Sequence, residues 1–419
     1  MSLRIHLVSE HASPLALLGT VDAGGQNVHV AALAKGLQAL GAKVVVHTRR
    51  DDPSLPRRVT LATGVIVEHV DAGPPVPIPK DDLLPHMGQF ADELERSWNR
   101  VTPDVVHAHF WMSGLAAMDA GARVGVPVAQ TFHALGAEKQ AHQGAADRSP
   151  APRLEAERWL AANVDHLIPT TAREFRTLVD MGGRPDRMTV VPCGVDLELF
   201  RPDGPTWPRS SGRPRIVCVS RLVPRKGIGN VIAAVAKVPD VELLIAGGPP
   251  ASMLFEDEYA RTLLSTIDHL ALGDRVQLLG AVERPWVPSL MRSADIVCCT
   301  PWYEPFGMVA LEAMACGAPV VASCVGGLAE TVLDGHTGIL VPPRQPRSIR
   351  AAIEVLLHDP ARRRAMGTSA LRRAASYAWP TIAARTLHVA ERMQVSGRKS
   401  VATPPPSFAS SRALTGGAQ

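Results

Sequence analysis

The chain has 419 residues, which is long enough for two domains with sizeable cores. Its apolar content of 46% and charged content of 20% are ordinary for a globular protein, and a net charge of +4 gives no basis for binding nucleic acid. The first residues, MSLRIHLVSE, run directly into a strand pattern, so we expect no signal peptide. No apolar run reaches the length of a membrane span.

The six cysteines lie between Cys193 and Cys324, mostly inside apolar runs such as RIVCVS and DIVCCT. Buried thiols explain this placement better than disulfides or a metal site, and neither a CxxC pair nor an HExxH motif occurs. We therefore predict a reducing, cytoplasmic setting.

Short apolar runs alternate with helix-length segments along the chain, which is typical of parallel α/β units. In the first half, strands are predicted at 3–10, 42–48, 65–70, 104–109, 126–133 and 166–171. In the second half, they are predicted at 214–221, 241–248, 275–280, 295–301, 318–324 and 338–343. Two Rossmann-like domains are therefore expected, with bounds of 1–200 for the first, 201–215 for a linker rich in Pro, Gly, Ser and Arg, and 216–375 for the second.

The turn after the first strand contains Gly24 and Gly25, just before a helix that begins near Gln26. Glycine lets a backbone approach a ligand, and a helix start offers free N–H groups to an anion. A phosphate contact and an ordinary turn both remain open here. The dinucleotide fingerprint GxGxxG is absent, which argues against a dehydrogenase.

His133 lies at the end of the predicted strand 126–133, beside a Gly-containing loop. Ligands of open α/β sheets bind at the carboxyl ends of strands, so this position favours a site role over a structural one. His107 and His109 alternate along their own strand, and neither is assigned a role.

Arg221 and Lys226 lie in the loop that leads from strand 214–221 to a helix. Either they form a solvated basic loop, or both cations converge with helix N–H groups on a diphosphate. In the second case a metal ion would be unnecessary.

Two carboxylates flank the start of an apolar helix in YEPFGMVALEAMACG. The helix is predicted to begin near Phe306, because Pro305 suits a first turn and Gly317 suits a helix end. Glu304 precedes the helix, and Glu312 lies two turns into it. Ionised carboxylates only accept hydrogen bonds, so a polyhydroxylated ligand would satisfy both, whereas the alternative for Glu312 is a buried Arg.

The spacing of these acids, EPFGMVALE, resembles the E-x7-E motif of the retaining, nucleotide-sugar-dependent glycosyltransferases of family 4. The resemblance extends in order to about Val395. It also rests on the segments AGGQNVHV, HAHFWMSG, FHALG, SRLVPRKG and EAMACGAPVVASCVGGLAETVLDGHTGILVPP. It implies a GT-B fold, in which two Rossmann-like domains face a cleft and a helix at 376–395 crosses back to the first domain. Residues 396–419 are expected to be a tail without structure.

The resemblance also implies site residues. Glu312 is expected to hold ribose hydroxyls, Glu304 to contact the donor sugar, and His133 to lie near the reacting carbon. Arg221 and Lys226 are expected to stabilise the leaving diphosphate, which makes a metal unnecessary. The remaining donor-binding positions are Gly24, Gly25, Phe306, Gly307, Met308 and Val309.

Two subgroups are most similar: the inositol-phosphate N-acetylglucosaminyltransferases of mycothiol synthesis and the sucrose-phosphate synthases. Asn27, Lys80 and Arg153 match acceptor-binding positions of the first subgroup, although surface cations explain the last two equally well. Phe110 and Ala134 stand where that subgroup has Tyr and Thr, so two hydroxyl groups are lost. A different acceptor and an acceptor without phosphate are therefore both left open. The donor base is expected to be UDP, with GDP and ADP as alternatives.

The sequence thus predicts a cytoplasmic, metal-independent enzyme that binds a nucleotide sugar and a small acceptor, without nucleic acid or a transmembrane segment. Three alternatives remain open: a non-catalytic nucleotide-sugar-binding protein, a GT-B phosphorylase and a sugar-nucleotide epimerase.

Overall fold

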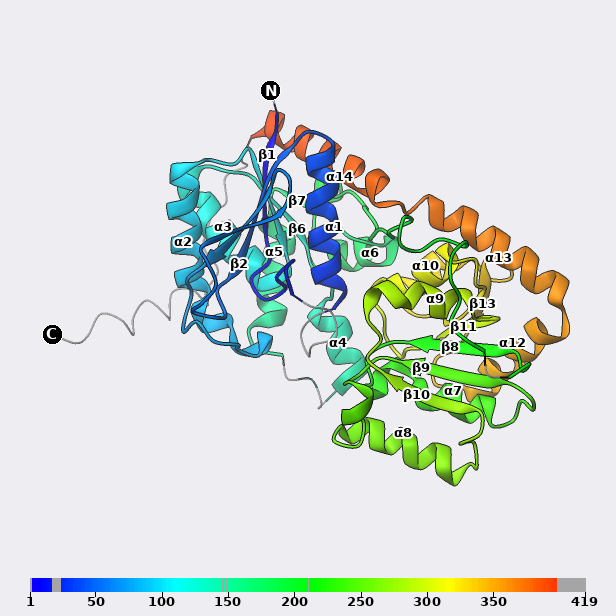
Figure 1. The fold of residues 1–419 in the computed structure, drawn as a ribbon. Helices are drawn as coiled ribbons and strands as arrows, with labels where there is room; N and C mark the ends of the chain where they lie inside the picture. The colour runs from blue at the N-terminus through cyan, green and yellow to red at the C-terminus, as the bar shows by residue number, and fades with distance from the viewer. Residues whose placement is uncertain (1, 17–23, 145–146, 148, 210, 398–419) are drawn as a thin grey trace. The chain divides into compact units, whose positions relative to one another are not determined.

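The structure is a computed structural model, which describes residues 2–16, 24–144, 147, 149–209 and 211–397. The described chain divides into two compact units (Figure 1). Unit 1 contains the residues up to Pro192 together with the segment that begins at Trp379, and unit 2 contains Cys193–Ala378. Each unit is an α/β structure built on its own sheet.

The sheet of unit 1 has seven strands in the order β3-β4-β2-β1-β5-β6-β7. Their bounds are β1 Arg4–Val8, β2 Lys43–Arg49, β3 Arg58–Ala62, β4 Val65–Val70, β5 Val105–His109, β6 Val128–Thr131 and β7 His166–Leu167. All neighbours pair in parallel except β3, which runs antiparallel to β4. The sequence did not predict β3, because RVTLA has no consistently buried face.

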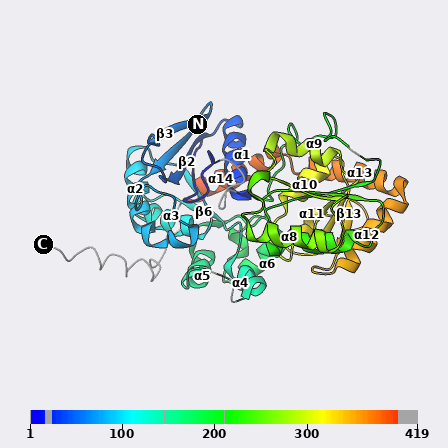
Figure 2. The ribbon, with the colours of Figure 1, turned by 60° about the horizontal axis from the view of Figure 1, so that its bottom comes forward.

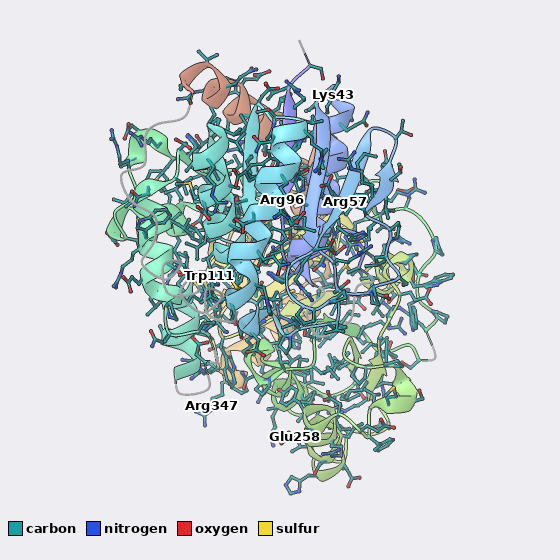
Figure 3. The ribbon with its side chains drawn as sticks, turned by 90° about the vertical axis from the view of Figure 1, so that its left-hand side faces the viewer. Lys43, Arg57, Arg96, Trp111, Glu258 and Arg347 are labelled. Atoms are coloured by element: carbon teal, nitrogen blue, oxygen red, sulfur yellow. The ribbon has the colours of Figure 1, made fainter. Side chains whose placement is uncertain are left out.

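Charged side chains protect this edge of the sheet. Arg58 of β3 donates to the buried carboxylate of Glu68 on β4, at 2.7 Å. Arg57 pairs with Glu93 of α2 (Met87–Arg100) at 3.4 Å, and Arg96 of the same helix also contacts Glu93. The two arginines are labelled in Figure 3. Charges along an edge strand discourage pairing with another chain.

Helices cover both faces of the unit 1 sheet. One face packs on α2, α3 and α5, and the other packs on α1 and α14. The remaining bounds are α1 Gly25–Ala39, α3 Trp111–Val124, α4 Gly136–Gln143, α5 Arg153–Asn163, α6 Ala172–Asp180 and α14 Trp379–Ser396, with short 3-10 turns at Lys80–Asp82, Leu84–His86 and Pro185–Arg187.

The helix α14, the last that the structure describes, belongs to unit 1 and lies beside α1 (Figures 1 and 2). Trp379, Ile382 and Ala383 join the same buried cluster as the apolar face of α1. The contact is close at Gly36 of α1, where an added Cβ would lie 2.7 Å from Cβ of Ala383. Unit 1 is therefore completed by α14, a helix that follows all of unit 2 in the sequence.

The sheet of unit 2 has six parallel strands in the order β10-β9-β8-β11-β12-β13. The strands are β8 Arg215–Val219, β9 Glu242–Ala246, β10 Val276–Gly280, β11 Ile296–Cys299, β12 Val320–Ser323 and β13 Gly338–Val341. The helices are α7 Ile228–Val235, α8 Glu258–His269, α9 Val287–Arg292, α10 Met308–Ala315, α11 Leu328–Thr331, α12 Pro346–His358 and α13 Pro360–Ala375, with 3-10 turns at Pro224–Lys226, Ala251–Met253 and Arg284–Trp286. The helices form one buried cluster on each face of the sheet.

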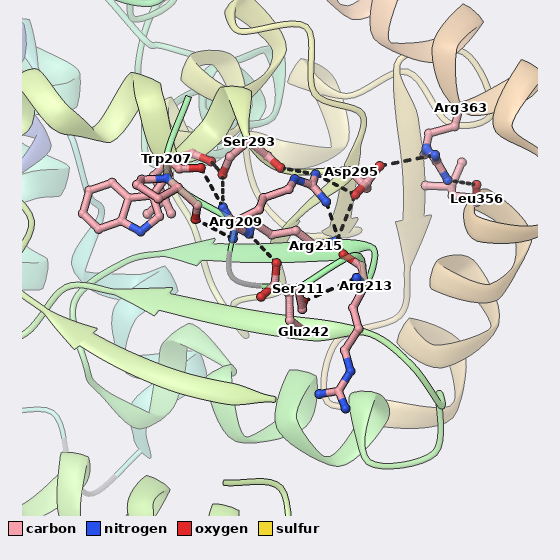
Figure 4. A network of polar contacts seen from close by, with 12 residues as sticks. Trp207, Arg209, Ser211, Arg213, Arg215, Glu242, Ser293, Asp295, Leu356 and Arg363 are labelled. Atoms are coloured by element: carbon pink, nitrogen blue, oxygen red, sulfur yellow. Dashed lines mark hydrogen bonds and ion pairs between the residues drawn. The ribbon is translucent and has the colours of Figure 1, made fainter. Parts of the chain in front are cut away.

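The segment 201–215, whose composition indicates a linker, lies inside unit 2 and is anchored there (Figure 4). Trp207 N–H donates to Ser289 O at 2.8 Å, and Arg209 Nη2 donates to Asp295 Oδ2 at 3.0 Å. Composition indicates irregular backbone but not the partners that fix it. The chain instead leaves unit 1 after Pro192 and returns after Ala378.

All six cysteines are free thiols, and only Cys324 is exposed. Among the described helices, none combines the length and the apolar character that crossing a membrane requires. The predicted tail, from residue 398 onward, lies outside the described residues.

Candidate active site

In unit 2 the predicted donor-binding residues follow two strands that are neighbours in the sheet. The loop after β8 carries Arg221 and Lys226, and the loop after β11 carries Glu304. The two loops meet, because Trp302 N–H donates to Arg225 O at 2.7 Å. The fold therefore gathers these side chains at the carboxyl edge of the sheet, where α/β proteins bind ligands.

Lys226 and Glu304 form an ion pair, in which Lys226 Nζ contacts Glu304 Oε2. The two side chains are only 16% and 18% exposed, so solvent screens the pair little. Burial would raise the pKa of Glu304, but the charge of Lys226, followed by those of Arg225 and Arg221, outweighs burial and holds that pKa below its ordinary value. Glu304 is therefore an ionised hydrogen-bond acceptor in a cationic setting.

Glu312, buried within α10, is paired with a cation. Its Oε1 lies 3.0 Å from Nη1 of Arg284, whose guanidinium also lies over the ring of Phe200 at 5.1 Å. Burial raises the pKa of Glu312 and Arg284 partly offsets this effect. The structure thus contains the Arg partner that was the alternative explanation for Glu312, and its ribose contact stays a prediction. Sequence reasoning missed Arg284, although it lies just after β10.

The helix α10 begins at Met308, two residues later than predicted, because Gly307 takes a left-handed conformation with φ +94°. Gly307 provides no side-chain cap, so the first N–H groups of the helix, including those of Met308 and Val309, keep the capacity to bind an anion. Phe306, just before this turn, is buried in the same apolar cluster as Ala310 and Leu311.

The Glu304 loop rests on two glycines that the sequence analysis did not single out. Gly327 N–H donates to Glu304 O at 3.0 Å. A Cβ at Gly326 would lie 1.9 Å from Glu304 O, and one at Gly327 would lie 2.4 Å from Phe306 Cα. The pair VGG directly after strand 318–324 was the available signal, since only glycine permits such a close approach.

In unit 1, α1 begins at Gly25 with Gly24 as its N-cap, one residue earlier than the predicted start near Gln26. Gly24 N–H donates to Asn27 Oδ1 at 2.9 Å, and Asn27 Nδ2 donates to Ser13 O at 2.9 Å. Asn27 is buried, and both ends of its amide are used by its own chain. It organises the glycine turn, and its predicted acceptor contact remains untested.

His133 and Phe110, at the ends of neighbouring strands, both have positive φ angles, of +61° and +80°. Such conformations are strained for residues other than glycine and cluster at functional sites. His133 Nε2 is hydrogen-bonded to His109 Nδ1 at 2.9 Å. Burial, and next the nearby His29, lowers the pKa of His133 well below its ordinary value, so the imidazole is neutral.

Three histidines of unit 1, His29, His109 and His133, each offer a nitrogen within 4.8 Å of the others. They are the group that could hold a metal within the part of the chain that the structure describes. However, the rings of His109 and His133 are only 25° apart in plane, and their nitrogens meet at hydrogen-bond distance. A metal with Zn–N bonds of about 2.0–2.1 Å would require these rings to turn.

Arg153 is buried and already has partners. Its Nε donates to Glu157 at 2.8 Å, its Nη2 donates to Ala134 O at 2.7 Å, and its guanidinium lies over Phe110 at 5.1 Å. The structure thereby brings together Arg153, Ala134 and Phe110, three positions that the resemblance links to the acceptor. Glu157 balances the charge of Arg153.

Lys80 is half-buried at the start of a 3-10 turn. The next residue, Asp81, faces Lys139 at 3.7 Å, and Lys139 donates to Ser149 Oγ at 2.9 Å. Ser149 Oγ also accepts from Arg153 Nη1 at 3.1 Å. The turn that carries Lys80 is therefore linked to Arg153 through a short polar chain.

A polar group at the end of β1 was missed. The buried carboxylate of Glu10 contacts His11 Nδ1 at 2.7 Å and the hydroxyl of Ser113. The His11 ring packs edge-on against Phe110, with centroids 4.8 Å apart. Glu10 ends the predicted strand 3–10 and His11 follows it, but their partners come from distant segments.

Comparison with known proteins shows which family this chain belongs to. Residues 23–199 match the model of Glycosyltransferase Family 4, and residues 205–373 match that of Glycosyl transferases group 1. A D-inositol 3-phosphate glycosyltransferase from Kineococcus radiotolerans is 37% identical over 93% of this chain and 95% of its own. The chain is a family 4 glycosyltransferase.

Other relatives agree with this assignment. A D-inositol 3-phosphate glycosyltransferase from Mycobacterium bovis is 38% identical over 90% of this chain and 80% of its own length. Among solved structures, sucrose-phosphate synthase from Thermosynechococcus elongatus is 30% identical, with a TM-score of 0.86 over 94% of this chain and all of that one. The Anabaena protein HepE in complex with UDP-glucose, at 21% identity and a TM-score of 0.71, shares the fold over 93% of this chain and all of its own. The family 4 glycosyltransferase thus has the predicted GT-B fold.

Proposed function

We propose that this glycosyltransferase transfers a hexose, of the glucose or N-acetylglucosamine type, from a UDP-sugar to a hydroxyl of a small phosphorylated acceptor, with retention of configuration and without a metal. The observation that carries the proposal is the cluster of cations around Glu304, in the loops that follow β8 and β11 of unit 2. There, Lys226 contacts Glu304, and Arg221 and Arg225 act on the same carboxylate.

The charges in these loops suit a departing diphosphate. A bound diphosphate would give Lys226 a second anionic partner and would release Glu304 to accept hydrogen bonds from sugar hydroxyls. Positive charge placed where negative charge develops lowers a barrier because it needs no rearrangement at that moment. The two arginines and Lys226 supply charge that a metal ion provides in other transferases, which supports metal independence.

In this proposal the chemistry depends mainly on positioning. The leaving phosphate takes the proton of the acceptor hydroxyl, and attack occurs on the face from which the nucleotide departs. Glu312 and Arg284 would hold the nucleoside. Gly25 and the start of α10 would offer N–H groups to the phosphates, and Gly24, which has no side chain, would let the backbone approach them. His133, Asn27, Lys80 and Arg153 are assigned to the sugar and acceptor on the basis of their matched positions.

The acceptor and donor classes follow from the relatives. Two are named D-inositol 3-phosphate glycosyltransferases, and a third is a sucrose-phosphate synthase, so a phosphorylated polyol or sugar is proposed. UDP is proposed because HepE was solved with UDP-glucose. Phe110 and Ala134 lack hydroxyls of the mycothiol subgroup, so discrimination between these acceptors needs a direct test.

One experiment tests donor and acceptor together. The purified protein is mixed with UDP-glucose or UDP-N-acetylglucosamine, and with D-inositol 3-phosphate or fructose 6-phosphate, and the products are identified by mass spectrometry. A new phosphorylated disaccharide or pseudodisaccharide is expected. UDP release without any glycoside would favour a non-catalytic or hydrolytic protein and would contradict the proposal.

Two further measurements address the finer claims. The anomeric proton coupling of the product, measured by NMR, should match that of the donor if configuration is retained. Activity should survive treatment with EDTA if no metal is required. The predicted cytoplasmic location can be tested by fractionation of cells that produce the protein.

A further inference from the structure

His109 has no role in the proposed function. His109 is the last residue of β5, is fully buried, and meets His133 through nitrogens 2.9 Å apart. The nearly coplanar rings, with centroids 5.1 Å apart, place the two nitrogens end to end. This geometry fits a single N–H···N hydrogen bond, in which one ring is the donor and the other is the acceptor.

Both rings are neutral, which limits the ways that protons can be arranged. Burial lowers the pKa of each imidazole well below its ordinary value, and the neighbouring histidines lower it further. Each ring therefore carries a single proton. If His109 Nδ1 holds the shared proton, then His109 Nε2 is bare and the proton of His133 is on Nδ1. In the opposite arrangement, His109 carries its proton on Nε2.

The surroundings of His109 Nε2 favour the first arrangement. This nitrogen is buried and has no hydrogen-bond partner among the residues that the structure describes. A proton there would be an orphaned buried donor, which is rare in proteins. His107 also leaves a buried ring nitrogen unprotonated. Thr131 Oγ donates its proton to Ile168 O, so it accepts a hydrogen bond from His107 Nε2–H, and the buried Nδ1 of His107 carries no proton.

We propose that His109 is a positioning residue, which donates Nδ1–H to His133 Nε2 so that His133 presents Nδ1–H to an oxygen of the transferred sugar or of the leaving phosphate. This inference rests on the proposed function. A neutral donor at this position stabilises developing negative charge without giving up its proton. His133 therefore acts as a hydrogen-bond donor and not as a general base.

The backbone supports the same role. His133 has a left-handed φ of +61°, and its ring also packs edge-on against His29, with centroids 4.9 Å apart. The bond to His109 fixes the remaining rotation of the ring, so Nδ1 of this half-buried side chain is the nitrogen available to a ligand.

The first test uses the wild-type protein labelled with 15N-histidine. Long-range 1H–15N spectra distinguish protonated from bare ring nitrogens, and the His133 signals are assigned by their loss in His133→Asn. We expect a protonated Nδ1 and a bare Nε2 in His133, and the same pattern in His109. A proton on His133 Nε2, or an imidazolium form at neutral pH, would overturn the inference. This result does not depend on any transferase activity.

The second test uses two nearly isosteric variants of His109. Asn offers an amide N–H in the place of Nδ1, whereas Asp offers only acceptor oxygens and would reverse the bond. We expect His109→Asn to retain most of the transfer rate. His109→Asp should lower kcat about 10- to 100-fold, the loss expected for one hydrogen bond to a charged group, while UDP binding by calorimetry stays the same.

The outcomes separate this inference from the proposed function. Equal losses in the Asn and Asp variants, with unchanged UDP binding, would show that His109 does not act through the direction of its hydrogen bond. If the wild type forms no glycoside with any donor, the proposed function fails, while the tautomer spectra still confirm or reject the arrangement of protons.

Discussion

Lys226 and Glu304 neutralise each other across two loops, so each is held in place before any substrate arrives. We predict that Lys226→Ala lowers kcat/KM for transfer by about 100-fold or more, since removal of one preorganised charged donor costs roughly 3–4 kcal/mol in transition-state stabilisation. Initial rates with saturating acceptor measure this loss. Lys237→Ala, which removes an exposed cation from the same unit, serves as the matched control and should leave rates unchanged.

A second prediction concerns Glu174, in the first turn of α6. Burial raises its pKa from 4.5 to about 7, although Thr170 N–H and Oγ–H both donate to its Oε2. Between these two pH values the folded protein holds a proton that the unfolded chain releases. Its stability therefore falls as pH rises from about 4.5 to 7 and stays lowered above that range.

Glu174→Gln, which removes the charge but keeps the acceptor oxygen, should raise the melting temperature by a few degrees at pH 8 and change it little at pH 5. Thermal unfolding at both pH values tests this expectation. Glu155→Gln, at an exposed position of α5, is the control and should show no difference between them. An equal gain for Glu174→Gln at pH 5 and pH 8 would contradict the argument.

Individual site residues differ in how far sequence could identify them. Glu304 and Lys226 were found because each follows a strand, and parallel strands align their ends. The partner of Glu312 was not found, because Arg284 lies on a separate loop and no local pattern specifies which cation reaches a buried acid. The same limit applies to Glu10 and His11, whose significance depends on Ser113 and Phe110 from distant segments.

Among elements, the loop that carries Glu304 depends on the glycine turn beneath it. Gly326 has φ +47°, and any Cβ there would collide with Glu304 O at 1.9 Å. Gly335 also has a left-handed φ, of +73°, but nothing lies within 4 Å of its Cβ position. Gly326 therefore combines a left-handed φ with a close backbone approach, whereas Gly335 has the left-handed φ alone.

We predict that Gly335→Ala costs about 1–2 kcal/mol of stability from strain alone and leaves UDP affinity unchanged. Gly326→Ala should cost more and should also weaken UDP binding, because the loop must shift to relieve the collision. Denaturant unfolding and calorimetry with UDP measure the two effects. Unaltered UDP affinity in Gly326→Ala would show that this turn does not set the position of Glu304.

The sequence predicted most strands and helices correctly. The missed strand and the misinterpreted segment each have a local cause. The predicted strands are present because their apolar side chains are mostly buried, continuously so in Val105–His109. The edge strand Arg58–Ala62 lacks such burial and was missed. The segment 201–215 was interpreted as a linker because composition does not reveal that Arg215 pairs with Glu242 at 2.7 Å and ties the segment to unit 2.

For the whole molecule, the two units differ in how they are assembled from the chain. Among the described residues, unit 2 is one continuous segment, and both of its apolar clusters lie within 193–378. Unit 1 needs α14 to cover α1, since Trp379 and Ile382 share a buried cluster with Val30 and Leu33.

We predict that a fragment of residues 193–378 folds alone and unfolds cooperatively, as followed by circular dichroism. A fragment of residues 1–192 should be aggregation-prone, because it exposes the apolar face that α14 covers. Co-expression with residues 379–397 should restore its solubility. A soluble, cooperatively unfolding 1–192 fragment would show that α14 contributes little to the stability of unit 1.

The place of α14 in unit 1 also sets the order in which this protein can mature on the ribosome. Most residues of unit 1 are synthesised first, yet its apolar face on α1 stays uncovered until α14 has emerged. Unit 2 can finish folding while unit 1 is still incomplete, since domains fold as units during synthesis. Premature termination after Ala378 would therefore release a chain with an intact second unit and an exposed first one, a species that chaperones and proteases can recognise.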